Sequence, residues 1–125
     1  MTNFHLSLPV KNFEETRLFY CDLLKGTLEK NTPEWFNVIL EGHQLTFHLL
    51  NNEVIKSRHL HWGLILSWDK FHTIFNILKQ HSVPFTLLPD YQETGTPSER
   101  VKMVFTDPSD YLIEFKAYKD EKAKI

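Results

Sequence analysis

The sequence predicts an α+β fold built from two copies of one unit, a strand followed by a helix and further strands. Two alignments of the chain with itself carry this prediction. Placing His5 over His61 brings the apolar residues behind both histidines into register, and each strand then runs into an amphipathic helix. Placing His48 over Glu114 matches the strands that close the two halves, with an insertion in the second half around "LPDYQETGTPSE".

Alternation and capping define the first strand and the first helix. In "FHLSLPV" apolar side chains alternate with His5 and Ser7, so these two residues face away from the apolar side. Asn12, followed three residues later by Glu15, forms a capping box that opens a helix over residues 13–24.

The rest of the first half is predicted to form strands joined by turns. Gly26 is the stop signal of the helix, and strands are expected at 27–31, 35–40 and 44–50. The polar stretch 51–58 is interpreted as the link between the halves.

The second half repeats this order of elements. The strand in "HLHWGLIL" places His61 opposite its leucines, and Ser67 caps a helix whose apolar residues recur at helical spacing to about Gln80. The remaining segments are predicted to be a strand at 85–88, a loop at 89–98, a strand at 100–106, the turn "DPSD" and a strand at 111–117.

The apolar faces of these elements define the expected core. Sheet residues are expected to pack against helix residues, and the set comprises Leu6, Leu8, Phe47, Leu64, Leu66, Ile113 and Phe115 with Phe19, Tyr20, Leu23, Phe71, Ile74, Phe75 and Leu78.

Composition bounds the class of protein. A chain of 125 residues that is 42% hydrophobic and 24% charged is long enough to bury the core of one globular domain. The net charge of −2, with acidic and basic residues interspersed, excludes the basic stripe that a nucleic-acid partner requires. No apolar run approaches the ~20 residues that span a bilayer, and no signal peptide pattern is present, so we expect a cytoplasmic protein without a membrane partner.

The single cysteine, Cys21, cannot form an internal disulfide, and its side chain is expected to be packed and unreactive.

Four polar residues on the sides of strands opposite the apolar stripes suggest a metal site. Imidazole nitrogen and carboxylate oxygen are the donors that suit Zn, Fe, Ni or Mn. If the two halves are related by a pseudo-two-fold axis, their first and last strands meet at the centre, and we therefore expect a divalent metal site formed by His5, His48, His61 and Glu114.

Several segments together resemble a known family. They are "FHLSLPV" with "FYCDLL", "GHQLTFHL", "HWGLIL" and, most specifically, "VFTDPSDYLIEFKAY". Over nearly the whole chain they are similar to the vicinal oxygen chelate superfamily of glyoxalase I, extradiol dioxygenases and bleomycin resistance proteins. The resemblance implies a single domain over 1–125, with two βαβββ modules at roughly 3–50 and 59–118 forming a cupped mixed sheet with helices on its outer face.

The resemblance also implies roles for the four polar residues. His5, His61 and Glu114 match the family's most regular metal ligands, and His48 stands where glyoxalase I has a glutamate ligand. The alternative for His48 is a hydrogen bond to a ligand or an acid/base role beside the metal. The chain also departs from the family pattern at Asp110, which stands where the last turn usually has Gly; Asp tolerates positive φ, so we expect an intact turn.

Three functions remain open at this stage. The favoured one is a dioxygenase-like enzyme whose metal chelates a small oxygen-rich substrate, with Glu114 staying bound and His48 moving protons. The first alternative is a glyoxalase I-type lyase or isomerase, in which Glu114 leaves the metal to abstract a substrate proton. The second is a non-catalytic binding protein of the bleomycin resistance type, which holds a drug between two subunits and implies a homodimer.

Overall fold

The computed structural model describes residues 2–49 and 60–123, which fold into two compact units. The first unit takes in residues 1–56 and 108–110, and the second takes in 57–107 and 111–125. The expected link at 51–58 and His59 lie outside the described residues.

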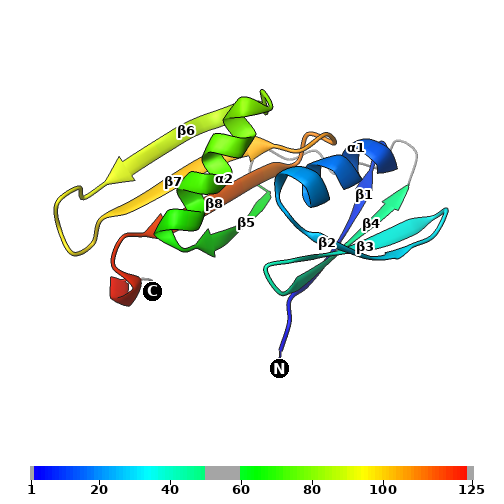
Figure 1. The fold of residues 1–125 in the computed structure, drawn as a ribbon, viewed down its shortest axis with the longest axis horizontal. Helices are drawn as coiled ribbons and strands as arrows, with labels where there is room; N and C mark the ends of the chain where they lie inside the picture. Colours follow the sequence, from blue (N-terminus) through cyan, green and yellow to red (C-terminus); the bar gives the residue numbers. More distant parts are fainter. Residues whose placement is uncertain (1, 50–59, 124–125) are drawn as a thin grey trace. The chain divides into compact units, whose positions relative to one another are not determined.

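The first unit is a four-stranded mixed sheet with a helix on one face (Figure 1). Its strands follow the order β1-β4-β3-β2, in which β1 is parallel to β4 and the other pairs are antiparallel. The predicted strands are confirmed within a residue at their ends. The elements are β1 (His5–Val10), α1 (Phe13–Arg17), η1 (Leu18–Leu23), β2 (Thr27–Asn31), β3 (Trp35–Leu40) and β4 (His43–Leu49).

The helical run predicted at 13–24 is present, but its second half is a π-helix. Asn12 caps its start, since its side chain accepts a hydrogen bond from the backbone N–H of Glu15. At the other end the N–H of Leu24 donates to the carbonyl of Phe19, five residues earlier. The wider turn brings Phe19 and Leu24 into the core and leaves Leu23, an expected core residue, only half-buried.

Aromatic rings join this helix to its sheet. The rings of Tyr20 and Phe47 lie 4.5 Å apart, and those of Phe13 and Phe36 lie 5.0 Å apart. Because β-strand side chains alternate, the residues beside Phe47 on β4 face the opposite side of the sheet. His48 therefore lies on the face that the helix leaves uncovered.

The second unit repeats the arrangement with strand order β5-β8-β7-β6, β5 being parallel to β8 (Figure 1). The predicted βαβββ fold is confirmed in both units. The elements are β5 (His61–Leu66), α2 (Trp68–Gln80), β6 (Phe85–Gln92), β7 (Arg100–Thr106), β8 (Leu112–Tyr118) and a 3-10 turn, η2 (Glu121–Ala123).

The helix α2 has the bounds that its pattern predicted. The side chain of Ser67 accepts a hydrogen bond from the N–H of Lys70, and Phe71, Ile74 and Leu78 are buried. Phe75, also expected in the core, is half-buried and packs its ring edge-on against Phe85 at 5.6 Å.

Two connections that join strands of the second sheet test the sequence predictions. The loop expected at 89–98 is shorter than predicted, because β6 runs on to Gln92 through register shifts that accommodate Pro89. The turn before β8 is intact. There the Asp107 carboxylate accepts a hydrogen bond from the N–H of Tyr111 at 3.0 Å, and Asp110 has φ 68°, as the sequence predicted. Among the described residues no helix is long and apolar enough to cross a membrane.

Candidate metal centre

Glu114 and His61 lie on the face of the second sheet that α2 leaves uncovered. On β8, Ile113 and Phe115 are fully buried towards the helix, so Glu114 between them points to the other side. His61 opens β5, and its side chain is 48% exposed against 17% for Glu114.

These two side chains come together in the structure. Nε2 of His61 lies 3.9 Å from Oε2 of Glu114, which is too far for a hydrogen bond. Two donors that each bind one first-row ion at about 2.1 Å can lie at most about 4.2 Å apart. The 3.9 Å separation lies within this limit, and binding as adjacent ligands of an octahedral ion, about 3 Å apart, would require the two donor atoms to move about 1 Å closer.

Gly63 lies close against the other strand beside this pair. It is opposite Glu114 in the parallel register of β5 and β8, and a Cβ atom placed on it would collide with the Glu114 carbonyl oxygen. A cavity of ≈ 230 Å³ opens here and is lined by His61, Trp62, Gly63, Leu64, Ile65, Glu114 and Lys116.

In the first unit, His5 and His48 share the uncovered sheet face but lie apart along it. His5 is opposite Gln44 in the register of β1 and β4, whereas His48 is opposite Pro9. Four residues of strand separate the two histidines, which is about 13 Å. This spacing argues against binding of one ion by His5 and His48 together, and the roles of both residues stay predictions.

The registers also correct one of the two internal alignments. If His5 corresponds to His61, then Gln44 corresponds to Leu112, because these are their cross-strand neighbours. Counting two residues on, the counterpart of Glu114 is Thr46, and His48 corresponds instead to Lys116. The alignment of His48 with Glu114 was wrong because side-chain alternation fixes only the parity of a strand, and a slip of two residues preserves it.

The side chain of Thr46 is hydrogen-bonded to a residue of the neighbouring strand. It is buried, and its hydroxyl donates to the side-chain oxygen of Asn37, directly across β3 and β4, at 2.7 Å. The first unit thus has a neutral hydroxyl where the second has a carboxylate.

Three other described histidines are held by local hydrogen bonds. His43 Nδ1 accepts from the N–H of Phe4, His72 bonds to the hydroxyl of Tyr91 at 2.7 Å, and His81 bonds to the carbonyl of Ile77 at 2.8 Å. In residues 2–49 and 60–123, no three His, Cys, Asp or Glu side chains lie grouped closely enough to hold an ion. Convergence of His5 with His61 and Glu114 stays a prediction.

One residue near the centre was missed by the sequence reasoning. Lys116 follows Glu114 on the same face of β8, and its Nζ lies 3.7 Å from Glu114 Oε2. The alternation that identified Glu114 also identifies Lys116, since it lies two residues further along the same strand.

Comparison with known proteins agrees with this fold. Residues 4–115 match the family model described as the glyoxalase/bleomycin resistance protein/dioxygenase superfamily. No curated protein matches the chain in sequence.

Solved structures show the same fold over nearly the whole chain. A glyoxalase/bleomycin resistance protein/dioxygenase from Alicyclobacillus acidocaldarius is 27% identical with a TM-score of 0.81, and the match covers 99% of this chain and 96% of that one. The fosfomycin resistance protein of Listeria monocytogenes is 14% identical with a TM-score of 0.78, covering 98% of each chain, and this likeness shows the fold alone. The match of the family model to 4–115, with the two βαβββ units, shows that the chain belongs to the glyoxalase/bleomycin resistance protein/dioxygenase superfamily.

Proposed function

We propose that this protein is a divalent-metal-dependent enzyme whose ion is held by His5, His61 and Glu114. The observation that carries the proposal is the spacing of His61 and Glu114, 3.9 Å apart on an open sheet face beside a glycine. Their half-exposed cavity can admit both an ion and a small molecule.

The donor set fits Fe, Mn, Ni or Zn, because two imidazoles and one carboxylate combine borderline and hard donors. Such a set leaves about three positions of an octahedral ion for other molecules. When bound, the ion would polarise oxygen atoms of the substrate. The substrate class is therefore a small molecule with two neighbouring oxygen atoms.

The reaction that we favour is dioxygenase-like. With three protein ligands, a bidentate substrate and O₂ can be held side by side on a facial site. Glu114 would stay bound in this reaction, and Lys116, 3.7 Å away, would help to hold its carboxylate. His48 is the candidate for moving protons, because an imidazole ring has one nitrogen that can accept a proton and one that can donate it.

The glyoxalase-type lyase or isomerase is the second candidate. The sequence resemblance put His48 at the glutamate ligand of glyoxalase I, whereas the strand register supports Thr46, which is buried and hydrogen-bonded to Asn37, as the counterpart of Glu114. A threonine hydroxyl is a poorer metal ligand than a carboxylate, so we favour the glyoxalase-type reaction less than the dioxygenase-like one.

The third candidate is a binding protein without catalysis. It does not explain why His61 and Glu114 lie close together.

Metal content of the purified protein tests the proposal. We expect about one divalent ion per chain in the parent, and loss of that ion in His5→Ala, His61→Ala and Glu114→Gln. His81→Ala is the matched control, since this imidazole is exposed and bonds only to its own helix. A parent that stays metal-free during titration with Fe(II), Mn(II), Ni(II) and Zn(II) would favour the binding protein.

Oxygen uptake separates the two enzymatic candidates. The Fe(II) form is expected to consume O₂ with catecholic substrates in air. If a broad panel gives no uptake while the metal is bound, lyase or isomerase chemistry becomes the better assignment.

A homodimer belongs to the third candidate, because the bleomycin resistance type binds its ligand between two subunits. Light scattering of the purified protein tests it, and a monomer at micromolar concentration would contradict it. The expected cytoplasmic location is tested by fractionation of cells that produce the protein.

A further inference from the structure

Two lysines face each other on the uncovered side of the second sheet. Lys102 of β7 lies directly opposite Lys116 of β8 in the antiparallel register. Both lysines are half-buried and lie on the same face as Glu114. Lys116 follows Glu114 by two residues on β8, and Lys102 is the cross-strand partner of Lys116.

This arrangement is unfavourable for the folded protein by itself. Like charges directly opposite on neighbouring strands destabilise a sheet. Within residues 2–49 and 60–123, Lys102 makes no ion pair within 4 Å, although Asp90 of β6 is its cross-strand partner on the other side. The carboxylate nearest to Lys116 is that of Glu114 at 3.7 Å. The face therefore holds positive charge that the described protein groups compensate only in part.

The lysines line a second cavity, of ≈ 100 Å³, next to the one at the candidate metal centre. Its lining residues are Asp90, Gln92, Arg100, Val101, Lys102, Lys116 and Tyr118. Lys116 lines both cavities. One small molecule can therefore extend from the His61 and Glu114 pair to the lysines.

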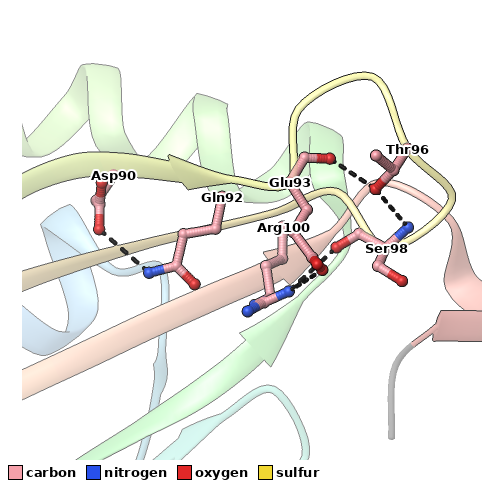
Figure 2. A network of polar contacts seen from close by, with 6 residues as sticks. All are labelled: Asp90, Gln92, Glu93, Thr96, Ser98 and Arg100. Atoms are coloured by element: carbon pink, nitrogen blue, oxygen red, sulfur yellow. Dashed lines mark hydrogen bonds and ion pairs between the residues drawn. The ribbon is translucent and has the colours of Figure 1, made fainter.

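The other charges of the smaller cavity have partners. Figure 2 shows Arg100 directed at Glu93, with Nη1 at 2.7 Å from the carboxylate and 3.4 Å from the carbonyl oxygen of Ser98. Asp90 accepts a hydrogen bond from the Gln92 amide at 3.4 Å. Arg100 is thus paired with an acidic group, whereas Asp90 keeps its negative charge opposite Lys102. With three cations and one carboxylate in the lining, the two lysines are the cations left to bind an incoming anion.

We propose that Lys102 and Lys116 bind an anionic group of the substrate, a carboxylate or a phosphate. The identity of the molecule's other end rests on the proposed metal-dependent function. The Nζ atom of Lys116 lies 3.7 Å from Oε2 of Glu114. The substrate is then a small acid whose charged group lies close to its chelating oxygens.

A divalent ion at the proposed metal centre would add to the positive charge of this face. Glu114 is the carboxylate nearest to Lys116, and an ion on Glu114 would share that negative charge. The positive charges of the two ammonium groups and the ion could then be neutralised by a substrate that carries one or two negative charges. Affinity for the acid is therefore expected to rise when the metal is present.

Anion binding by the metal-free protein tests the lysine pair without the metal. Inorganic phosphate and succinate are titrated separately, and amide chemical shifts are followed by NMR. Shift changes are expected on β7 and β8, with affinity that falls as salt rises. The probe that binds more tightly identifies the anionic group, and shift changes confined to other elements for both probes would overturn the proposal.

Variants give the quantitative test. Lys102→Gln and Lys116→Gln should each raise the dissociation constant of the better probe about tenfold, the usual effect of losing one charge-assisted hydrogen bond. Lys79→Gln is the control, because Lys79 lies on α2, on the other side of this sheet, and its side chain contacts Phe75. Equal dissociation constants in all three variants would overturn the proposal.

The two proposals fail in different ways. Loss of anion binding with normal metal stoichiometry removes the lysine site and leaves the metal centre standing. Anion binding without any metal uptake keeps the lysine site and removes the proposed metal-dependent reaction.

Discussion

Gly63 and Glu114 lie opposite each other in the parallel pair of β5 and β8, so closely that Gly63 has no room for a side chain. A Cβ atom there would meet the carbonyl oxygen of Glu114, a backbone atom that cannot rotate away. The backbone of Gly63 thus fixes the distance between the strand that carries His61 and the strand that carries Glu114.

Gly63→Ala should therefore push the two strands apart. We expect the free energy of unfolding to fall by about 1–3 kcal/mol, the usual cost of forcing an extra methyl group into a packed site. Metal affinity should fall as well, because the ligand spacing changes. Urea denaturation and metal titration measure the two effects.

Ile65→Ala serves as the control for this variant. Ile65 is two residues further along β5 on the same face and is 48% exposed, so its truncation should change stability little. A Gly63→Ala protein as stable as the parent would show that β5 can shift without cost.

The core gives a second prediction. Phe71 of α2 is fully buried, and Phe71→Ala should lower the free energy of unfolding by about 3–5 kcal/mol. The control is Leu88→Ala, whose side chain is 59% exposed and which should stay within about 0.5 kcal/mol of the parent. Similar losses in both variants would contradict the observed packing.

Much of the fold could be predicted because alternation and helical spacing are local signals. The strands, the capping by Asn12 and Ser67, and the end of α2 at Gln80 all follow from such patterns. The π-helical turn could not be predicted, because an apolar pattern with the α-helical period of 3.6 residues does not reveal the wider turn. The N–H of Leu24 bonds to the carbonyl of Phe19 five residues earlier, instead of four.

The site was predictable only in part, for a related reason. Alternation tells which face His61, Glu114 and His48 share, and the structure brings the first two together. It cannot tell how far one strand slides along its neighbour, and this register determines that Thr46 rather than His48 is the counterpart of Glu114. Lys102 and Lys116 become a pair only through the same cross-strand register.

The thiol of Cys21 should react slowly in the folded protein. Burial raises the pKa of Cys21, the neighbouring Asp22 carboxylate raises it further, and Arg17 partly offsets the rise. Because the thiolate is the reactive form, alkylation by iodoacetamide at neutral pH should be slower in the native protein than in urea. Mass spectrometry of timed samples measures both rates, and a faster native reaction would point to a nucleophilic cysteine.

The same shift predicts a dependence of stability on pH. The folded state holds the thiol proton more tightly than the unfolded state, so this contribution is complete below the unfolded pKa. It is lost as the pH rises through the folded pKa. Cys21→Ser should therefore lose less stability than the parent between neutral and strongly alkaline pH, as followed by thermal unfolding.

The final prediction concerns His48 and Thr46. Because His48 lies four residues beyond the partner of His5, His48→Ala should keep the metal, and the proposed proton-transfer role predicts lower turnover in the oxygen-uptake assay. Thr46→Glu places a carboxylate at the position equivalent to Glu114 and should raise metal affinity while lowering the stability of the metal-free protein, since Thr46 is buried. Metal stoichiometry and thermal unfolding with and without metal measure these effects. Loss of the ion in His48→Ala would make His48 a required ligand, and unchanged affinity in Thr46→Glu would remove Thr46 from the neighbourhood of the ion. The matched pair thus decides, by binding alone, which residue of β4 faces the metal.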